Sequence, residues 1–207
     1  MLILTPGGRQ KKTYNDKFSL QNERRIWRKD AMSINVLEKK ELEAAINILL
    51  TTEGSTTKAI ENLVGQDVTI EVYDQEVVLK NELPKEIAKH FFGSEKFLKR
   101  TSTLKIGKQN VSHNIVYASV DLLPAEFVQK LRDGNQPIGK IIQDLGTNRN
   151  ILSAQFKNIQ PYRSMLHKAT LVDATYPVKE YKILKGDFCL FYIFELFEET
   201  CILWNLK

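Results

Sequence analysis

The chain has 207 residues, of which 43% are apolar and 27% are charged, and its formal net charge is +5. This composition supports a packed core and excludes wholesale disorder, and the length suits one domain. No apolar run reaches the roughly 20 residues of a transmembrane helix. The first residues, MLILTPGGRQKK, have too short an apolar piece for a secretory signal. We therefore expect a cytoplasmic protein with no membrane partner.

The positive charge is concentrated at the N-terminus. Residues 1–29 contain eight Lys or Arg and two acidic residues, a sum of +6, so the remaining 178 residues sum to −1. Such a segment could contact nucleic acid or a membrane surface, or it could be a solvated terminus. Because nucleic-acid-binding motifs are missing, we expect no nucleic-acid partner. We expect a basic arm at residues 1–33 and a domain at 34–207.

Cysteine and histidine usage gives no sign of a metal site. The two cysteines, Cys189 and Cys201, form no CxxC pair, and the three histidines are scattered along the chain. Zinc sites need ligands at characteristic spacings, which are absent. We therefore expect reduced thiols, no metal and no cofactor.

The predicted elements fall into blocks of helices and strands. Helical spacing of apolar residues, with capping residues and prolines at the starts, predicts helices at 36–51, 57–65, 84–93, 124–134 and 137–146. Alternation predicts strands at 67–73 and 76–83, which turn at 74–76, then at 97–107 and 113–123, and a hairpin over 181–197. The βαβ alternation of parallel sheets is missing. We predict an α+β fold with a mainly antiparallel sheet.

The strand at 97–107 has two unlike faces. One face carries Arg100 among apolar residues such as Leu98 and Leu104. The other face is predicted to meet water and carries Lys99, Thr101, Thr103 and Lys105. Arg100 is therefore a candidate buried charge.

The last strand carries a second candidate, Glu195, in the run FCLFYIFELF. Both faces of this strand are apolar, which predicts a central strand covered on both sides. Burial would raise the pKa of Glu195, and Arg100 is the simplest partner for an ion pair. Such a pair could be structural, but buried ion pairs seldom add stability over apolar residues. In a ligand site, Arg100 would grip a carboxylate and Glu195 would supply a hydrogen bond or a proton.

The motifs of the chain, taken in order, resemble the chorismate pyruvate-lyase (4-hydroxybenzoate synthase) family. They are AAINILLTTEGSTTKAI, Arg100 in LKRTSTL, YASVDLLP, QPIGKIIQDLGTNR, and Glu195 in FYIFELF. The resemblance covers residues 45–198. It implies a six-stranded antiparallel sheet flanked by helices, with two helix-turn-helix lids over an internal pocket. It also implies conversion of chorismate to 4-hydroxybenzoate and pyruvate.

The same resemblance implies site residues. Arg100 would hold the carboxylate of the ligand, an aromatic or cyclohexadienyl carboxylate, assisted by the main-chain N–H of Lys99. Ile138 would contribute a main-chain contact, Thr56 would belong to a lid, and Glu195 would lie near the ring oxygen. Arg100 and Glu195 would be the catalytic pair.

Two departures from the family pattern bear on substrate and turnover more than on fold. Glu53 stands where Asp is usual, and no proline follows the ELF of Glu195. The alternative is a non-catalytic binding domain for a small aromatic carboxylate, of the effector-sensing type, on the same fold.

Overall fold

The structure is a computed structural model that describes residues 36–163, 166, 171 and 174–205. The chain divides after Lys39, and residues 40–207 form one unit. The predicted basic arm at 1–33 lies outside the described residues. None of the described helices is long and apolar enough to cross a membrane.

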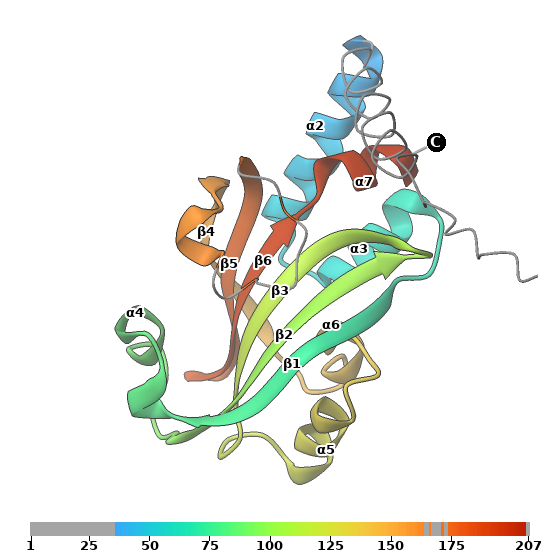
Figure 1. Cartoon of the computed structure of the whole chain (residues 1–207). Helices are drawn as coiled ribbons and strands as arrows, with labels where there is room; N and C mark the ends of the chain where they lie inside the picture. The colour runs from blue at the N-terminus through green and yellow to red at the C-terminus, as the bar shows by residue number, and fades with distance from the viewer. Residues whose placement is uncertain (1–35, 164–165, 167–170, 172–173, 206–207) are drawn as a thin grey trace, which may run out of the picture. The chain divides into compact units, whose positions relative to one another are not determined.

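Six helices and six strands make up the described structure (Figure 1). The helices are α2 (Val36–Thr51), α3 (Thr56–Val64), α4 (Lys85–Ala88), α5 (Ala125–Asp133), α6 (Ile138–Ile141) and α7 (Glu199–Asn205). The strands are β1 (Thr69–Leu79), β2 (Lys96–Ile106), β3 (Gln109–Ser119), β4 (Asn148–Asn158), β5 (Thr175–Lys185) and β6 (Phe188–Phe197). Two short 3-10 turns lie at Lys80–Glu82 and Gln160–Tyr162.

The strands form one sheet in the order β1-β2-β3-β6-β5-β4, with every neighbouring pair antiparallel. Two three-stranded meanders, β1 to β3 and β4 to β6, therefore meet where β3 pairs with β6. Each meander follows a pair of helices, because α2 and α3 precede β1 while α5 and α6 precede β4. The predicted α+β class with a mainly antiparallel sheet of about six strands is confirmed.

Both faces of the sheet are covered. On one face, α5 and α6 pack on the middle strands, and α2 and α3 pack on the ends of β2, β3 and β6. On the other face, Leu83 and Phe91, which flank α4, pack with Ile159 against aromatic residues of β2, β3 and β6. Figure 1 shows α3, α5 and α6 along the same side of the sheet. The predicted central position of the last strand is confirmed, since β6 lies between β3 and β5 and is buried after Phe188.

The predicted hairpin with a turn at 74–76 is wrong, because residues 69–79 form the single strand β1. Its pairing with β2 shifts register between Val72 and Asp74. A bulge adds one residue and restarts the alternation, so one strand looks like two in the sequence. The segment also lacks the glycine or asparagine that tight hairpin turns require.

The sequence predicts no element between the helix at 137–146 and the hairpin over 181–197, so strand β4 is a finding of the structure. It is an edge strand whose side chains are exposed or half-buried along its length. Without a buried face, its sequence carries no regular alternation of apolar and polar residues. The predicted gap between the strands at 97–107 and 113–123 is also too long. The turn occupies Gly107 and Lys108, and Gly107 adopts a positive φ of 56°, which suits a two-residue hairpin.

The second face of β2 is not the water-facing surface that its polar residues predicted. Thr101 and Thr103 are buried, and Thr103 Oγ1 lies 2.9 Å from His113 Nδ1 of β3. Threonine satisfies its hydroxyl locally and can therefore line a core. Lys99 and Lys105 stay partly exposed, and each forms an ion pair with a glutamate of β1.

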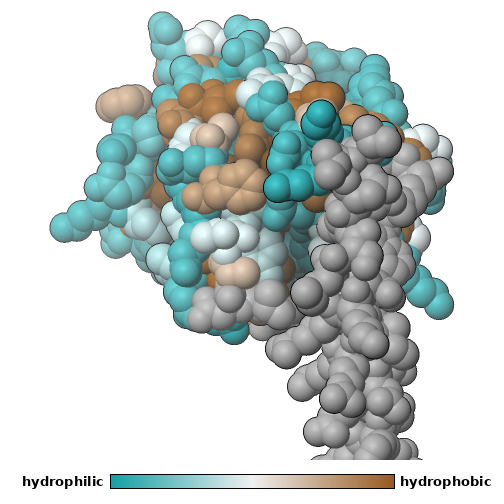
Figure 2. Space-filling view, turned by 90° about the horizontal axis from the view of Figure 1, so that it is seen from above, coloured by the Kyte–Doolittle hydropathy of each residue, from teal (hydrophilic) through white to brown (hydrophobic). Residues whose placement is uncertain are grey.

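The large apolar side chains that remain exposed include two on each edge strand. They are Val77 and Leu79 of β1 and Leu152 and Phe156 of β4. In the face seen in Figure 2, apolar residues gather towards the middle and hydrophilic residues surround them. Scattered exposed apolar residues are ordinary on soluble domains.

Candidate functional site

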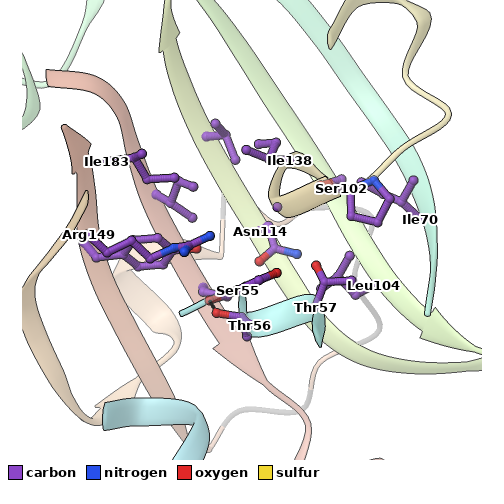
Figure 3. Close-up of a pocket in the computed structure, with 16 residues that line it drawn as sticks. Ser55, Thr56, Thr57, Ile70, Ser102, Leu104, Asn114, Ile138, Arg149 and Ile183 are labelled. Carbon is purple, nitrogen blue, oxygen red and sulfur yellow. Dashed lines mark hydrogen bonds between the residues drawn. The ribbon is translucent and has the colours of Figure 1, made fainter. Parts of the chain in front are cut away.

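An internal cavity lies between the sheet and the short helices α3 and α6 (Figure 3). All six strands contribute side chains to its wall, and Ser55, Thr56 and Thr57 enter it from the start of α3. Its volume is about 30 Å³, counted as the space open to the centres of water molecules, which is room for about two waters. A ring-sized ligand therefore requires α3 or α6 to move outward.

The two helices that cover the cavity, α3 and α6, are in direct contact. Ser55 caps α3, its Oγ accepting from the N–H of Lys58 at 3.4 Å, and Gly139 of α6 approaches this cap so closely that a Cβ there would lie 2.4 Å from Ser55 Oγ. An ion pair of 2.7 Å between Lys140 Nζ and Glu61 Oε1 also joins α6 to α3. The glycine is thus required by close packing of the two helices.

Glu195 lies on the cavity wall and is only 3% exposed. Thr56 Oγ1 donates a hydrogen bond of 2.9 Å to its Oε2, so the first residue of α3 is tied to the centre of the sheet. Burial raises the pKa of Glu195, against the opposing effects of the Lys179 charge, the Thr56 hydrogen bond, the Arg149 charge and the Tyr181 hydroxyl. The carboxyl group therefore holds its proton to higher pH than an exposed glutamate.

Lys179 is the nearest opposite charge in the register, because it pairs with Glu195 across β5 and β6. It is fully buried, and its Nζ donates to the carbonyl of Leu49 at 3.1 Å and to that of Thr52 at 2.5 Å. Burial and the charge of Arg149 lower the pKa of Lys179, whereas Glu195 raises it. The lysine thus satisfies the C-terminal carbonyls of α2 and places a cation behind Glu195.

Arg100 is 1% exposed and is not among the residues that line the cavity, although its neighbours are. Its cross-strand partner on β3, Val116, lines the cavity, and its Nη2 donates a hydrogen bond of 3.2 Å to the carbonyl of Gln136, next to the cavity residue Pro137. Its Nε and Nη1 have no hydrogen-bond partner, and neither has Oε1 of Gln75, its cross-strand partner on β1. Burial lowers the pKa of Arg100 to about 10. A buried guanidinium with unmet donors is energetically costly.

The expected ion pair between Arg100 and Glu195 is wrong for the described structure. Burial alone shifts the pKa of Arg100, and the charges that act on Glu195 are those of Lys179 and Arg149. The two residues share one face of the sheet but stand two strands apart, on β2 and β6. The parity argument therefore found two buried charges correctly and paired them incorrectly.

The other predicted site residues differ in where they lie. Thr56 and Ile138 line the cavity together with Glu195. Lys99 does not line it, and its Nζ forms an ion pair of 2.6 Å with Glu76. The prediction for Lys99 concerned its main-chain N–H and stays a prediction.

Three residues at or beside the cavity escaped the sequence analysis: Arg149, Tyr181 and Lys179. Arg149 lies on the unpredicted strand β4, so no parity argument was available for it. Lys179 shares one face of β5 with the apolar Tyr181 and Ile183. A charged residue on an apolar strand face is the pattern that identified Arg100, so the same argument applied to β5 would have identified Lys179. The described residues contain no group of three or more His, Cys, Asp or Glu placed to hold a metal ion.

The fold is an α+β sheet with helices over an internal cavity. A family model described as chorismate pyruvate-lyase Rv2949c-like matches residues 50–204. The chain belongs to this family. The predicted family resemblance is confirmed, and with it the chorismate lyase-like fold. No curated protein matches the sequence.

Solved structures with some similarity include effector domains of transcriptional regulators. The ligand-binding domain of a GntR-family regulator from Bordetella bronchiseptica is 10% identical, with a TM-score of 0.45 over 64% of this chain and 84% of that one. The effector domain of PhnF from Mycobacterium smegmatis is 15% identical, with a TM-score of 0.47 over 70% and 88%. The longer PhnF structure is 13% identical, with a TM-score of 0.49 over 72% and 65%. These likenesses are too distant to indicate a ligand for this chain.

Proposed function

We propose that this protein is a chorismate lyase that converts chorismate to 4-hydroxybenzoate and pyruvate inside the cavity under α3 and α6. The observation that carries the proposal is Arg100, a buried guanidinium with two nitrogen atoms that lack partners. Removing a cation from water without an anion is unfavourable, so the site is suited to a ligand that brings a carboxylate. Membership of the chorismate pyruvate-lyase Rv2949c-like family supports the choice of ligand.

The reaction needs few groups from the protein. The bond between the ring carbon and the enolpyruvyl oxygen breaks, and the electron pair leaves with the oxygen. A ring hydrogen is lost as a proton, the ring becomes aromatic, and the released enolpyruvate becomes pyruvate by tautomerisation. Atoms and electrons balance with no external oxidant or reductant, and the aromaticity gained supplies the driving force.

In this proposal, Arg100 binds the ring carboxylate, and Glu195 acts as a donor to the oxygen atom that leaves the ring. Because burial raises the pKa of Glu195, its carboxyl group can donate a hydrogen bond or a proton to that oxygen at neutral pH. Thr56 holds the other side of the carboxyl group by its 2.9 Å hydrogen bond. The main chain at Ile138, at the start of α6, and that of Lys99 would complete the carboxylate site.

The test is turnover by the purified full chain, followed as 4-hydroxybenzoate by chromatography and as pyruvate by a coupled assay. Arg100→Met should remove activity while leaving stability equal or higher, because it replaces an uncompensated buried charge by an apolar chain of similar length. Glu195→Gln should keep ligand binding and lower kcat. Arg132→Met, at an exposed position on α5, is the matched control.

Two outcomes would contradict the proposal. A folded wild-type protein that binds 4-hydroxybenzoate but does not consume chorismate would be the non-catalytic binding domain instead. An Arg100→Met variant that is destabilised yet fully active would show that the arginine serves the fold, for example through Gln75.

A further inference from the structure

The two edge strands of the sheet, β1 and β4, present different side chains to water. Both are 11 residues long, and within the described part of the chain each pairs with one strand only, β1 with β2 and β4 with β5 (Figure 1). The exposed positions of β1 include three carboxylates, Glu71, Asp74 and Glu76. The exposed positions of β4 are all uncharged: Asn148, Asn150, Leu152, Ala154, Gln155, Phe156 and Asn158.

The two charged residues of β4 are engaged within their own chain. Arg149 is half-buried and lines the internal cavity, with its Nη1 3.4 Å from the carbonyl of Glu53. Lys157 is also half-buried and forms an ion pair with Glu180 of β5. Sheets commonly protect their edges from other strands with exposed charges. The edge at β1 has this protection and the edge at β4 lacks it, so β4 is suited to pair with a further strand.

The sequence of β4 is complementary to itself in one antiparallel register. Leu152 and Phe156 are 39% and 54% exposed, and they lie equally far from Ala154 on either side. Because side chains alternate between the two faces of a strand, both lie on the face of Ala154. A twofold axis through Ala154 would therefore place Leu152 of each copy opposite Phe156 of the other, and Asn150 opposite Asn158.

Charge distinguishes this register from the next one that keeps the same faces. A twofold axis through Ser153 would place Arg149 opposite Lys157 of the other copy, and like charges directly opposite each other destabilise a strand pair. With the axis through Ala154, Lys157 lies opposite the apolar Ile151 instead. The register that joins the exposed apolar side chains is thus also the one without repulsion.

We propose that β4 binds β4 of a second copy of this chain, so that the two sheets form one continuous antiparallel sheet. Main-chain hydrogen bonds join the two strands, and the two Leu152–Phe156 contacts fix their register. The interface is isologous, because the same edge is used by both copies. Since Arg149 of β4 lines the cavity, the pairing also holds one wall of each internal cavity. This inference goes beyond the proposed function and does not depend on it.

The test is the molar mass of the full chain in solution, measured by light scattering and sedimentation over a series of concentrations. The variants are Leu152→Glu, Phe156→Lys and the double variant that combines them. Val77→Glu, at a 52% exposed position on the other edge strand, is the matched control. Circular dichroism checks that each variant is folded.

The wild-type protein should reach a mass near twice the 23.9 kDa of one chain. Each single variant should raise the dissociation constant of the dimer about tenfold or more, because the twofold axis places each change in the interface twice. The double variant should recover most of the affinity, since each new carboxylate then faces a new ammonium group of the other copy. Within one chain these two groups stand about 13 Å apart and cannot pair. Val77→Glu should dimerise like the wild type.

Three outcomes would overturn the proposal. A wild-type protein that stays monomeric at every concentration has no β4 interface. Single variants that dimerise as tightly as the wild type would place the interface on another surface. A double variant as weak as the single ones would rule out the register that pairs Leu152 with Phe156. If Phe156→Lys fails to fold, the masses of the wild type and of Leu152→Glu decide.

Discussion

Gly139→Ala tests the contact by which the two covering helices close the cavity. An alanine Cβ would lie 2.4 Å from Ser55 Oγ, 1.0 Å less than the 3.4 Å at which ordinary contact begins. Ser55 cannot simply rotate away, because its oxygen caps α3 by accepting from the N–H of Lys58. Either the cap is lost or α6 moves away from α3.

The expected loss of stability in Gly139→Ala is the balance of opposing effects on the free energy of unfolding. Loss of a serine cap costs about 0.5–2 kcal/mol, and added volume in a packed contact costs about 1–3 kcal/mol. In the opposite direction, alanine in place of glycine within a helix stabilises the helix by up to about 1 kcal/mol. Since the strain is relieved by one of the two routes, we expect a net loss of about 1–2 kcal/mol. For a chain of this length that corresponds to a fall in Tm of about 2–8 °C.

The assay is thermal and urea unfolding of Gly139→Ala, Ser55→Gly and the double variant. Glycine is a tolerable cap, so Ser55→Gly alone should cost a few tenths of a kcal/mol. In the double variant the space vacated by the serine side chain should receive the new methyl group, and most of the loss should be recovered. A Gly139→Ala variant as stable as wild type, or a double variant whose losses simply add, would refute the proposed contact.

Two further predictions concern the buried charges of β5 and β6. The raised pKa of Glu195 means that its contribution to stability is complete below the usual value of 4.5 and is lost as pH rises towards the folded-state pKa. The free energy of unfolding of Glu195→Gln relative to wild type should therefore increase with pH over that window, by at most about 1.4 kcal/mol per pH unit, and a constant difference would contradict the burial of an acid. Lys179→Met removes the main charge that lowers the pKa of Glu195, so the alkaline limb of kcat/KM should move to higher pH. The partly exposed Lys182→Met on the same strand should leave the limb in place, and an unmoved limb in Lys179→Met would separate that lysine from the site.

Much of the architecture followed from local patterns in the sequence. Helix α3 begins after Ser55 and ends at Gly65, which adopts a positive φ of 66°, because capping and left-handed turns have strong residue preferences. The central place of β6 was predictable because only a strand buried on both sides is apolar on both sides. The burial of Arg100 and Glu195 followed from the same periodicity.

Local sequence patterns do not predict which residues of different strands lie side by side in the sheet. Whether Glu195 meets Arg100 or Lys179 depends on strand order and register, and the order β1-β2-β3-β6-β5-β4 places Lys179 directly beside Glu195 and Arg100 two strands away. Arg149 was hidden because an edge strand with no buried face has no periodic signal. The sequence by itself indicated that Arg100 and Glu195 leave water, since periodicity is a property of each strand alone. Only the tertiary structure decided which of them meet, since contacts between distant strands depend on how the whole sheet assembles.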